Sequence, residues 1–104
     1  MGTAERSLPR LSAKEQLILE LLIGRRNAMY GLELVGSSRG RLKRGTVYVT
    51  LARMEDKGLV TSRHQDAPPG DGGLLRRLYQ PTALARRLVQ VHAQLTKLLP
   101  ELAR

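Results

Sequence analysis

The chain of 104 residues contains no cysteine, tryptophan or phenylalanine. Without cysteine it can form neither a disulfide nor a thiolate metal site. Its two histidines, His64 and His92, have no ligand pattern around them, so we expect no metal and no cofactor. Aromatic residues are limited to three tyrosines, so the core has to be built mainly from leucine, valine and isoleucine. No carboxylate pair or Ser/His/Asp set stands out, which argues against an enzyme.

Long apolar runs are also missing. No window approaches the roughly 20 apolar residues that a membrane-spanning helix needs. Residues 1–10 lack the apolar stretch of a secretory signal. We therefore expect a cytoplasmic protein of one ordinary domain with a modest core.

Acidic residues are scarce relative to basic ones. Nine Asp and Glu stand against eighteen Lys and Arg, which gives a formal net charge of +9. A domain this basic usually meets a polyanion, with nucleic acid the first candidate and an anionic membrane surface the second. Fourteen of the cations are arginine, the better bidentate ligand for phosphate and guanine, which favours nucleic acid over a membrane.

The first predicted element is a helix that begins around Leu11–Glu15. Ser12 is its expected N-cap, and Glu15 stands three residues later to close a capping box. Gly24 is the expected C-terminal stop.

The remaining predicted elements follow from apolar periodicity and from glycine and proline breaks. They are a helix over 30–36, a turn over 37–41, a helix over 43–57 stopped by Gly58, a strand over 59–64, a loop over 67–73, a strand over 75–80 and a helix from Thr82 to the end. This order predicts a mainly α fold with a small β-hairpin, a winged helix-turn-helix followed by a C-terminal dimerisation helix. We divide the chain into an arm (1–10), a DNA-binding domain (11–80) and a dimerisation helix (81–104).

The helix over 43–57 has two distinct faces. Val47, Leu51 and Met54 form an apolar stripe that can enter a core. The outer stripe contains no acid, and four of its residues are expected to read base edges in the major groove: Thr46, Val49, Thr50 and Arg53. The alternative is a solvated helix face without a partner.

Other cations around this helix are expected to bind DNA phosphates. Arg41, Lys43 and Arg44 cluster at its start, where the helix dipole also favours an anion. Lys57, at its far end, can at most touch a phosphate. Tyr48 belongs to neither face and can either bind a phosphate or pack under the wing.

The hairpin is the predicted wing. It carries Arg63, Arg76 and Arg77, which can contact the DNA backbone or simply keep an edge strand soluble. Since side chains alternate along a strand, only one of Arg76 and Arg77 can point at DNA.

The last helix carries an apolar heptad seam, with spacings of 4, 3, 4, 3 and 4. Its residues are Leu84, Leu88, Val91, Leu95, Leu98 and Leu102. The seam can pack on the first helix or on a second subunit. We favour a homodimer, with Leu17, Leu21 and Leu22 adding to the partner surface.

Three segments resemble the PadR family of bacterial transcriptional regulators. Gly31-Leu32-Glu33-Leu34 corresponds to that family's Gly-aromatic-Glu-Ile segment. Residues 44–59 correspond to its Pro-Gly-Thr-Leu-Tyr-Pro-x-Leu-x-x-Leu-Glu-x-x-Gly-Leu segment, with Arg44 and Val49 in place of the two prolines. Residues 78–85 correspond to Tyr-Tyr-x-Leu-Thr-x-x-Gly, with departures at Leu78, Pro81 and Ala85.

The resemblance implies a dimeric winged-helix DNA-binding protein, usually a repressor. A two-fold dimer would place two recognition helices ~34 Å apart on a palindromic operator. It also implies a small-molecule inducer as a candidate partner, although without Trp or Phe a promiscuous aromatic pocket is not expected. The alternative function is a winged-helix adaptor that binds an acidic protein. RNA is a third candidate, which the shortage of stacking aromatics disfavours.

Overall fold

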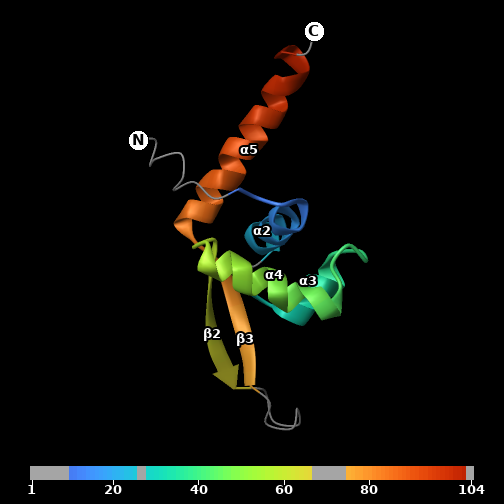
Figure 1. Cartoon of the computed structure of the whole chain (residues 1–104), viewed down its shortest axis with the longest axis vertical. Helices are drawn as coiled ribbons and strands as arrows, with labels where there is room; N and C mark the ends of the chain where they lie inside the picture. The colour runs from blue at the N-terminus through green and yellow to red at the C-terminus, as the bar shows by residue number, and fades with distance from the viewer. Residues whose placement is uncertain (1–9, 26–27, 67–74, 103–104) are drawn as a thin grey trace.

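The computed structural model describes residues 10–25, 28–66 and 75–102. The elements, in chain order, are α2 (Ala13–Arg25), β1 (Met29–Tyr30), α3 (Gly31–Ser37), α4 (Arg44–Asp56), β2 (Val60–Asp66), β3 (Leu75–Pro81) and α5 (Ala83–Leu102). In Figure 1, α2, α3 and α4 form a cluster, β2 and β3 extend from one side of it, and α5 projects from the other. This is the predicted winged helix with an added C-terminal helix.

Helix α2 begins with the predicted capping box. The Glu15 backbone N–H donates to Ser12 Oγ at 3.1 Å, and the Ser12 N–H donates to Glu15 Oε1 at 2.9 Å. These two bonds satisfy donors that a helix start otherwise leaves unpaired. The predicted stop at Gly24 is one residue early, since the helix includes Gly24 and ends at Arg25.

A tight turn joins α3 to α4. Ser38 is fully buried there, and its hydroxyl donates to the Val35 carbonyl at 2.8 Å while accepting from the Leu42 N–H at 2.9 Å. Arg39 and Gly40 follow with φ of 56° and 83°, which reverses the chain. Helix α4 then starts at Arg44, one residue later than predicted, with Lys43 as its N-cap.

The hairpin is longer than predicted and has a third strand beside it. Seven residues of β2 pair antiparallel with β3, from Val60 opposite Pro81 to Asp66 opposite Leu75. The two-residue β1 pairs with the other edge of β3 through Met29–Tyr79 and Tyr30–Leu78, giving the order β1-β3-β2. We expected a two-stranded hairpin. Two residues are too few to show a strand periodicity, so β1 could not be predicted.

The core lies where the three helices meet the root of the sheet. Its fully buried members include Ile18, Leu19 and Leu22 from α2, Leu34 from α3, Val47, Leu51 and Met54 from α4, and Leu59 and Val60 from the α4–β2 junction. The predicted inner stripe of α4 is therefore confirmed. Leu17 and Leu22 were expected to contribute to a partner surface, which is wrong because the protein's own core buries both.

Helix α5 is fixed to the body at its start. Thr82 caps it, since Thr82 Oγ1 accepts from the Ala85 N–H at 3.1 Å and donates to the Gly58 carbonyl at 2.7 Å. Ala85 is fully buried, and Leu88 and Val89 pack against the core. Among the described residues, no helix is long and apolar enough to cross a membrane.

Candidate nucleic-acid interface

The outer face of α4 is accessible along its length. Thr46 and Arg53 are exposed, Thr50 is half-buried, and 55% of Val49 is exposed to solvent. An apolar side chain this open on a surface helix is suited to contact the thymine methyl group. The predicted base-reading residues therefore share one open stripe, and their role stays a prediction.

The two threonines on this stripe use their hydroxyl protons within the helix. Thr50 Oγ1 donates to the Thr46 carbonyl at 3.1 Å, and Thr46 Oγ1 lies 3.4 Å from the Lys43 carbonyl. Each hydroxyl keeps acceptor capacity, and each methyl group is held in a set orientation. Each threonine can therefore accept a hydrogen bond from a base, or contact a thymine methyl group through its own methyl group. Neither hydroxyl needs to donate to the DNA, because its proton is already used within the protein.

The predicted phosphate-binding cations gather at the start of α4. Lys43 is the N-cap and Arg44 the first helical residue, and both are exposed. Arg41 is exposed as well, although its Nε donates to the Ser38 carbonyl at 3.3 Å. The first turn of α4 contains no acid, so three cations surround the positive end of the helix dipole. This combination favours an anion.

Tyr48 packs on α3, and its predicted packing under the wing stays a prediction. Its ring covers Gly31, so that a Cβ built on Gly31 would lie 2.5 Å from Tyr48 Cε1. The side chain is still 46% exposed, which leaves the predicted phosphate contact untested. The segments 31–34 and 44–59, which are separate motifs in the sequence, therefore meet at the contact between Gly31 and Tyr48.

Lys57 is placed differently from the other cations. Its ammonium donates to both carboxylate oxygens of Glu15, at 3.0 and 2.8 Å, and to the Arg10 carbonyl at 3.2 Å. Burial of Glu15 by itself raises the pKa of that carboxyl, but hydrogen bonds from Lys57 and Ser12 outweigh it, so the pKa is lowered. Lys57 thus joins the end of α4 to the start of α2.

The wing cations fall into two environments. Arg77 is half-buried within the paired part of the hairpin, where its Nη1 donates to Ser62 Oγ at 2.8 Å and its Nη2 lies 2.6 Å from His64 Nε2. Ser62 in turn donates to Glu55 on α4.

Arg76 is exposed, with its guanidinium carbon 5.2 Å from the centre of the Tyr30 ring. Arg63 is exposed, and the predicted tip over 67–73 lies outside the described residues.

Tyr79 closes the root of the sheet beneath α4. Only 5% of it is exposed, and burial raises the pKa of its phenol, partly offset by the positive charge of Arg77. The ring therefore stays neutral and supports the packing of the wing against α4.

The apolar seam of α5 divides along its length. Leu84 and Leu88 are half-buried, whereas Val91 and Leu95 are 48% and 55% exposed. The side chains of Leu98 and Leu102 lie outside what the structure describes. The first half of the helix is thus partly used by the protein's own core, and the described part beyond it offers an apolar surface.

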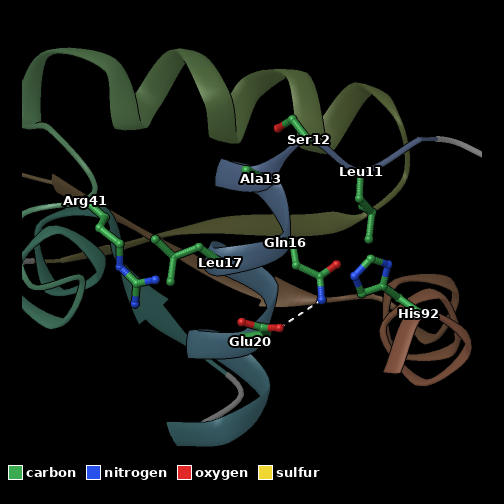
Figure 2. Close-up of a pocket in the computed structure, with 8 residues that line it drawn as sticks. All are labelled: Leu11, Ser12, Ala13, Gln16, Leu17, Glu20, Arg41 and His92. Atoms are coloured by element: carbon green, nitrogen blue, oxygen red, sulfur yellow. Dashed lines mark hydrogen bonds between the residues drawn. The ribbon is translucent and has the colours of Figure 1, made fainter. Parts of the chain in front are cut away.

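A hollow separates α2 from α5. Figure 2 shows Gln16 and Glu20 on α2 between His92 of α5 and Arg41 from the turn before α4. Gln16 Nε2 donates to Glu20 Oε2 at 2.9 Å, while Gln16 Oε1 is buried without a hydrogen-bond partner in the described structure. This hollow faces α5 and is separate from the outer stripe of α4. No group of three or more metal-ligating side chains occurs among the residues described.

The profile of the transcriptional regulator PadR-like family matches residues 18–90. The chain belongs to this family. A solved PadR family regulator of Clostridium difficile is 28% identical, with a TM-score of 0.63 over 84% of this chain and 92% of that one. A candidate transcriptional regulator of Thermoplasma acidophilum is 26% identical, with a TM-score of 0.66 over 85% and 84%. A PadR family regulator of Eggerthella lenta is 26% identical, with a TM-score of 0.59 over 96% and 80%.

A comparison with curated proteins finds no match. Membership of the PadR family makes this protein a DNA-binding transcriptional regulator, which agrees with the open basic helix α4. It is also consistent with the expectation that the chain is not an enzyme.

Proposed function

We propose that this PadR-family protein is a homodimeric repressor that reads a palindromic operator. The observation that carries the proposal is the outer stripe of α4, which is open, free of acids and bordered by cations at its start. Thr46, Val49, Thr50 and Arg53 would contact base edges in the major groove. Arg41, Lys43 and Arg44 would hold the phosphates beside the helix start.

The wing and Tyr48 would add contacts outside the major groove. Arg63 and Arg76 are the exposed wing cations, so they are better placed than the half-buried Arg77 for the backbone. The exposed part of Tyr48 could donate its hydroxyl proton to a phosphate. Lys57 is not assigned to a phosphate, because Glu15 and the Arg10 carbonyl occupy its ammonium.

In this proposal, DNA binding and dimerisation are carried by consecutive parts of the chain. Residues 11–80 would bind DNA and residues 81–104 would dimerise, with Val91 and Leu95 as the described, exposed part of the interface. Binding to the genome would place the protein in the cytoplasm. A small-molecule inducer remains a prediction, and the hollow in Figure 2, between the DNA-binding body and α5, is the place to look for one.

The test is a nuclease footprint on the DNA upstream of the protein's own gene, followed by affinity measurements on the protected site. We expect a two-fold symmetric footprint and steep salt dependence, with a log–log slope of about −0.9 per neutralised phosphate. Arg53→Ala should cost ~1–3 kcal/mol on the operator and little on random DNA, whereas Lys43→Ala should weaken both alike. Absence of a footprint, together with binding to an acidic protein, would favour the adaptor function.

A further inference from the structure

Beside the outer stripe of α4 lies a basic hollow whose other wall is the start of α2. Its lining residues are Arg10, Leu11, Ser12, Ala13, Lys14, Glu15, Thr50, Arg53 and Lys57. We propose that Arg10 and Lys14 bind DNA phosphates, so that the start of α2 extends the interface beyond α4 and the wing. This inference rests on the proposed function, because it assumes that Thr50 and Arg53 face the bases.

The charge of the hollow carries the argument. Four of its lining residues are cations and one, Glu15, is an acid. Glu15 is paired with Lys57 at 2.8 Å, which leaves Arg10, Lys14 and Arg53. Within the described part of the chain these three have no acidic partner, and Arg10, Lys14 and Arg53 are all exposed. Three uncompensated cations around one hollow form a site for a polyanion.

The place of the hollow, next to the proposed base-reading stripe, favours the DNA backbone as this polyanion. Thr50 and Arg53 belong both to the hollow and to the stripe proposed to read bases. The major groove is only about 12 Å wide, so cations beside a helix inserted in it lie close to the phosphates of a flanking strand. Arg10 and Lys14 are on the far side of the hollow from the stripe, which is where such phosphates would run.

Lys57 holds this arrangement in place. It donates to the Arg10 carbonyl at 3.2 Å and to Glu15, and so fixes the segment that carries Arg10 against the end of α4. Lys57 is a positioning residue in this scheme, since its own ammonium is occupied. No local pattern indicates this arrangement, because Lys57 and Glu15 are 42 residues apart.

The experiment compares two double variants of the full-length protein by salt titration of binding to operator and to random duplex DNA. Arg10→Gln/Lys14→Gln removes the proposed phosphate-binding cations. Arg25→Gln/Lys97→Gln is the matched control: it removes the same charge from the opposite end of α2, about 16 Å from Lys14, and from exposed Lys97 on α5. Thermal melting of both verifies that each variant is folded.

We expect the slope of the first variant to be shallower by about 0.9 for each phosphate that it no longer neutralises, with affinity near 0.1 M salt reduced about eightfold per phosphate on both DNAs. The control should keep a slope close to that of the unmodified protein. Equal slopes for the two double variants would overturn the inference and leave the proposed function standing. If the unmodified protein itself shows no salt-dependent binding to duplex DNA, the proposed function fails instead.

A second titration, with poly-glutamate as probe, separates DNA from an acidic protein. Loss of poly-glutamate binding in Arg10→Gln/Lys14→Gln, with DNA binding unchanged, would overturn the inference in favour of an acidic protein partner.

Discussion

Gly31 and Tyr48 show how two short segments of sequence depend on each other. Gly31 opens α3 and Tyr48 lies in the second turn of α4, and the tyrosine ring occupies the space that a side chain on residue 31 would need. The reason for a glycine here is this close approach and not the backbone conformation, since the φ of Gly31 lies outside the left-handed region. The contact lies between the two helices of the helix-turn-helix.

Gly31→Ala should therefore displace the Tyr48 ring. Because the obstructing atoms are the outer end of a half-exposed side chain that can swing aside, we expect a loss of no more than ~1 kcal/mol in the free energy of unfolding, measured by urea denaturation. In a Tyr48→Ala background the same substitution should cost much less, because the obstruction is gone. Equal costs in both backgrounds would show that the ring is not what excludes a side chain at residue 31.

Arg44 stands where the PadR segment that the sequence resembles has proline, and the backbone before Arg44 suits either residue. It is the first residue of α4, and the preceding Lys43 has a ψ of 144°, the extended backbone that a following proline requires. Proline would pre-form the helix start. Arginine instead puts a cation there.

Arg44→Pro should raise the free energy of unfolding by ~0.4–1 kcal/mol, because it restricts the unfolded chain at a compatible position. It should also weaken DNA binding as much as Arg44→Gln, which removes the charge alone. Denaturation and DNA titration of the two variants separate these effects. A destabilised Arg44→Pro protein would contradict the account of the helix start.

At the scale of elements, the ion pair between Glu15 and Lys57 joins the beginning of α2 to the end of α4. The Glu15 side chain is only 4% exposed, whereas that of Lys57 is 37% exposed, so the carboxylate depends on its partners more than the ammonium does. The same carboxylate also accepts the Ser12 N–H of the capping box. One side chain thus starts α2 and fixes its position against the end of α4.

This pair predicts a pH dependence of stability. The pKa of Glu15 is lowered in the folded protein from a usual value of 4.5, so its contribution is present above that pH and is lost as pH falls through the folded pKa. Lys57→Met should cost ~1–3 kcal/mol at neutral pH, because a buried acceptor loses its donor. The difference between the two proteins should shrink in acid.

Urea denaturation of both proteins between neutral pH and about pH 3 measures the effect, with Lys97→Met as the control for removal of an exposed lysine. A difference that stays constant with pH would mean that Lys57 stabilises the fold by packing and not through the Glu15 charge.

At the scale of the molecule, α5 is the element that the rest of the fold leaves partly uncovered. It is attached by Thr82 and Ala85 and then projects away from the three-helix cluster (Figure 1). Val91 and Leu95 keep about half of their surfaces in solvent, on a helix whose apolar residues follow a heptad spacing. Such a surface is suited to a second copy of the chain.

Leu95→Glu should convert the proposed dimer into a monomer and weaken operator binding, since one subunit reaches only half of a palindrome. Analytical ultracentrifugation and a footprint on the operator report the two effects. Ala93→Glu adds the same charge at an exposed position on the opposite face of α5 from the seam and should leave both unchanged. A dimer that persists in Leu95→Glu places the interface elsewhere.

Residue patterns alone determined the order of the elements other than β1, the inner stripe of α4, the caps at Ser12, Gly58 and Thr82, and the basic outer stripe. These depend on local spacing, hydrogen bonds within a few residues and net charge, all of which can be read along the chain. They also carry the resemblance to PadR regulators. The helix boundaries moved by only a residue or so, because helix ends depend on local capping.

Only the tertiary structure decided which residues meet across long separations. It shows that β1 pairs with the sheet and that the Tyr48 ring lies over Gly31. It also shows that Lys57 forms an ion pair with Glu15, and that Arg10 and Lys14 line the same hollow as Arg53. It also moved Leu17 and Leu22 from a proposed partner surface into the core. An apolar or charged side chain has the same pattern in sequence whether its partner is solvent, its own core or another molecule. Packing of distant segments, which no local periodicity encodes, makes that choice.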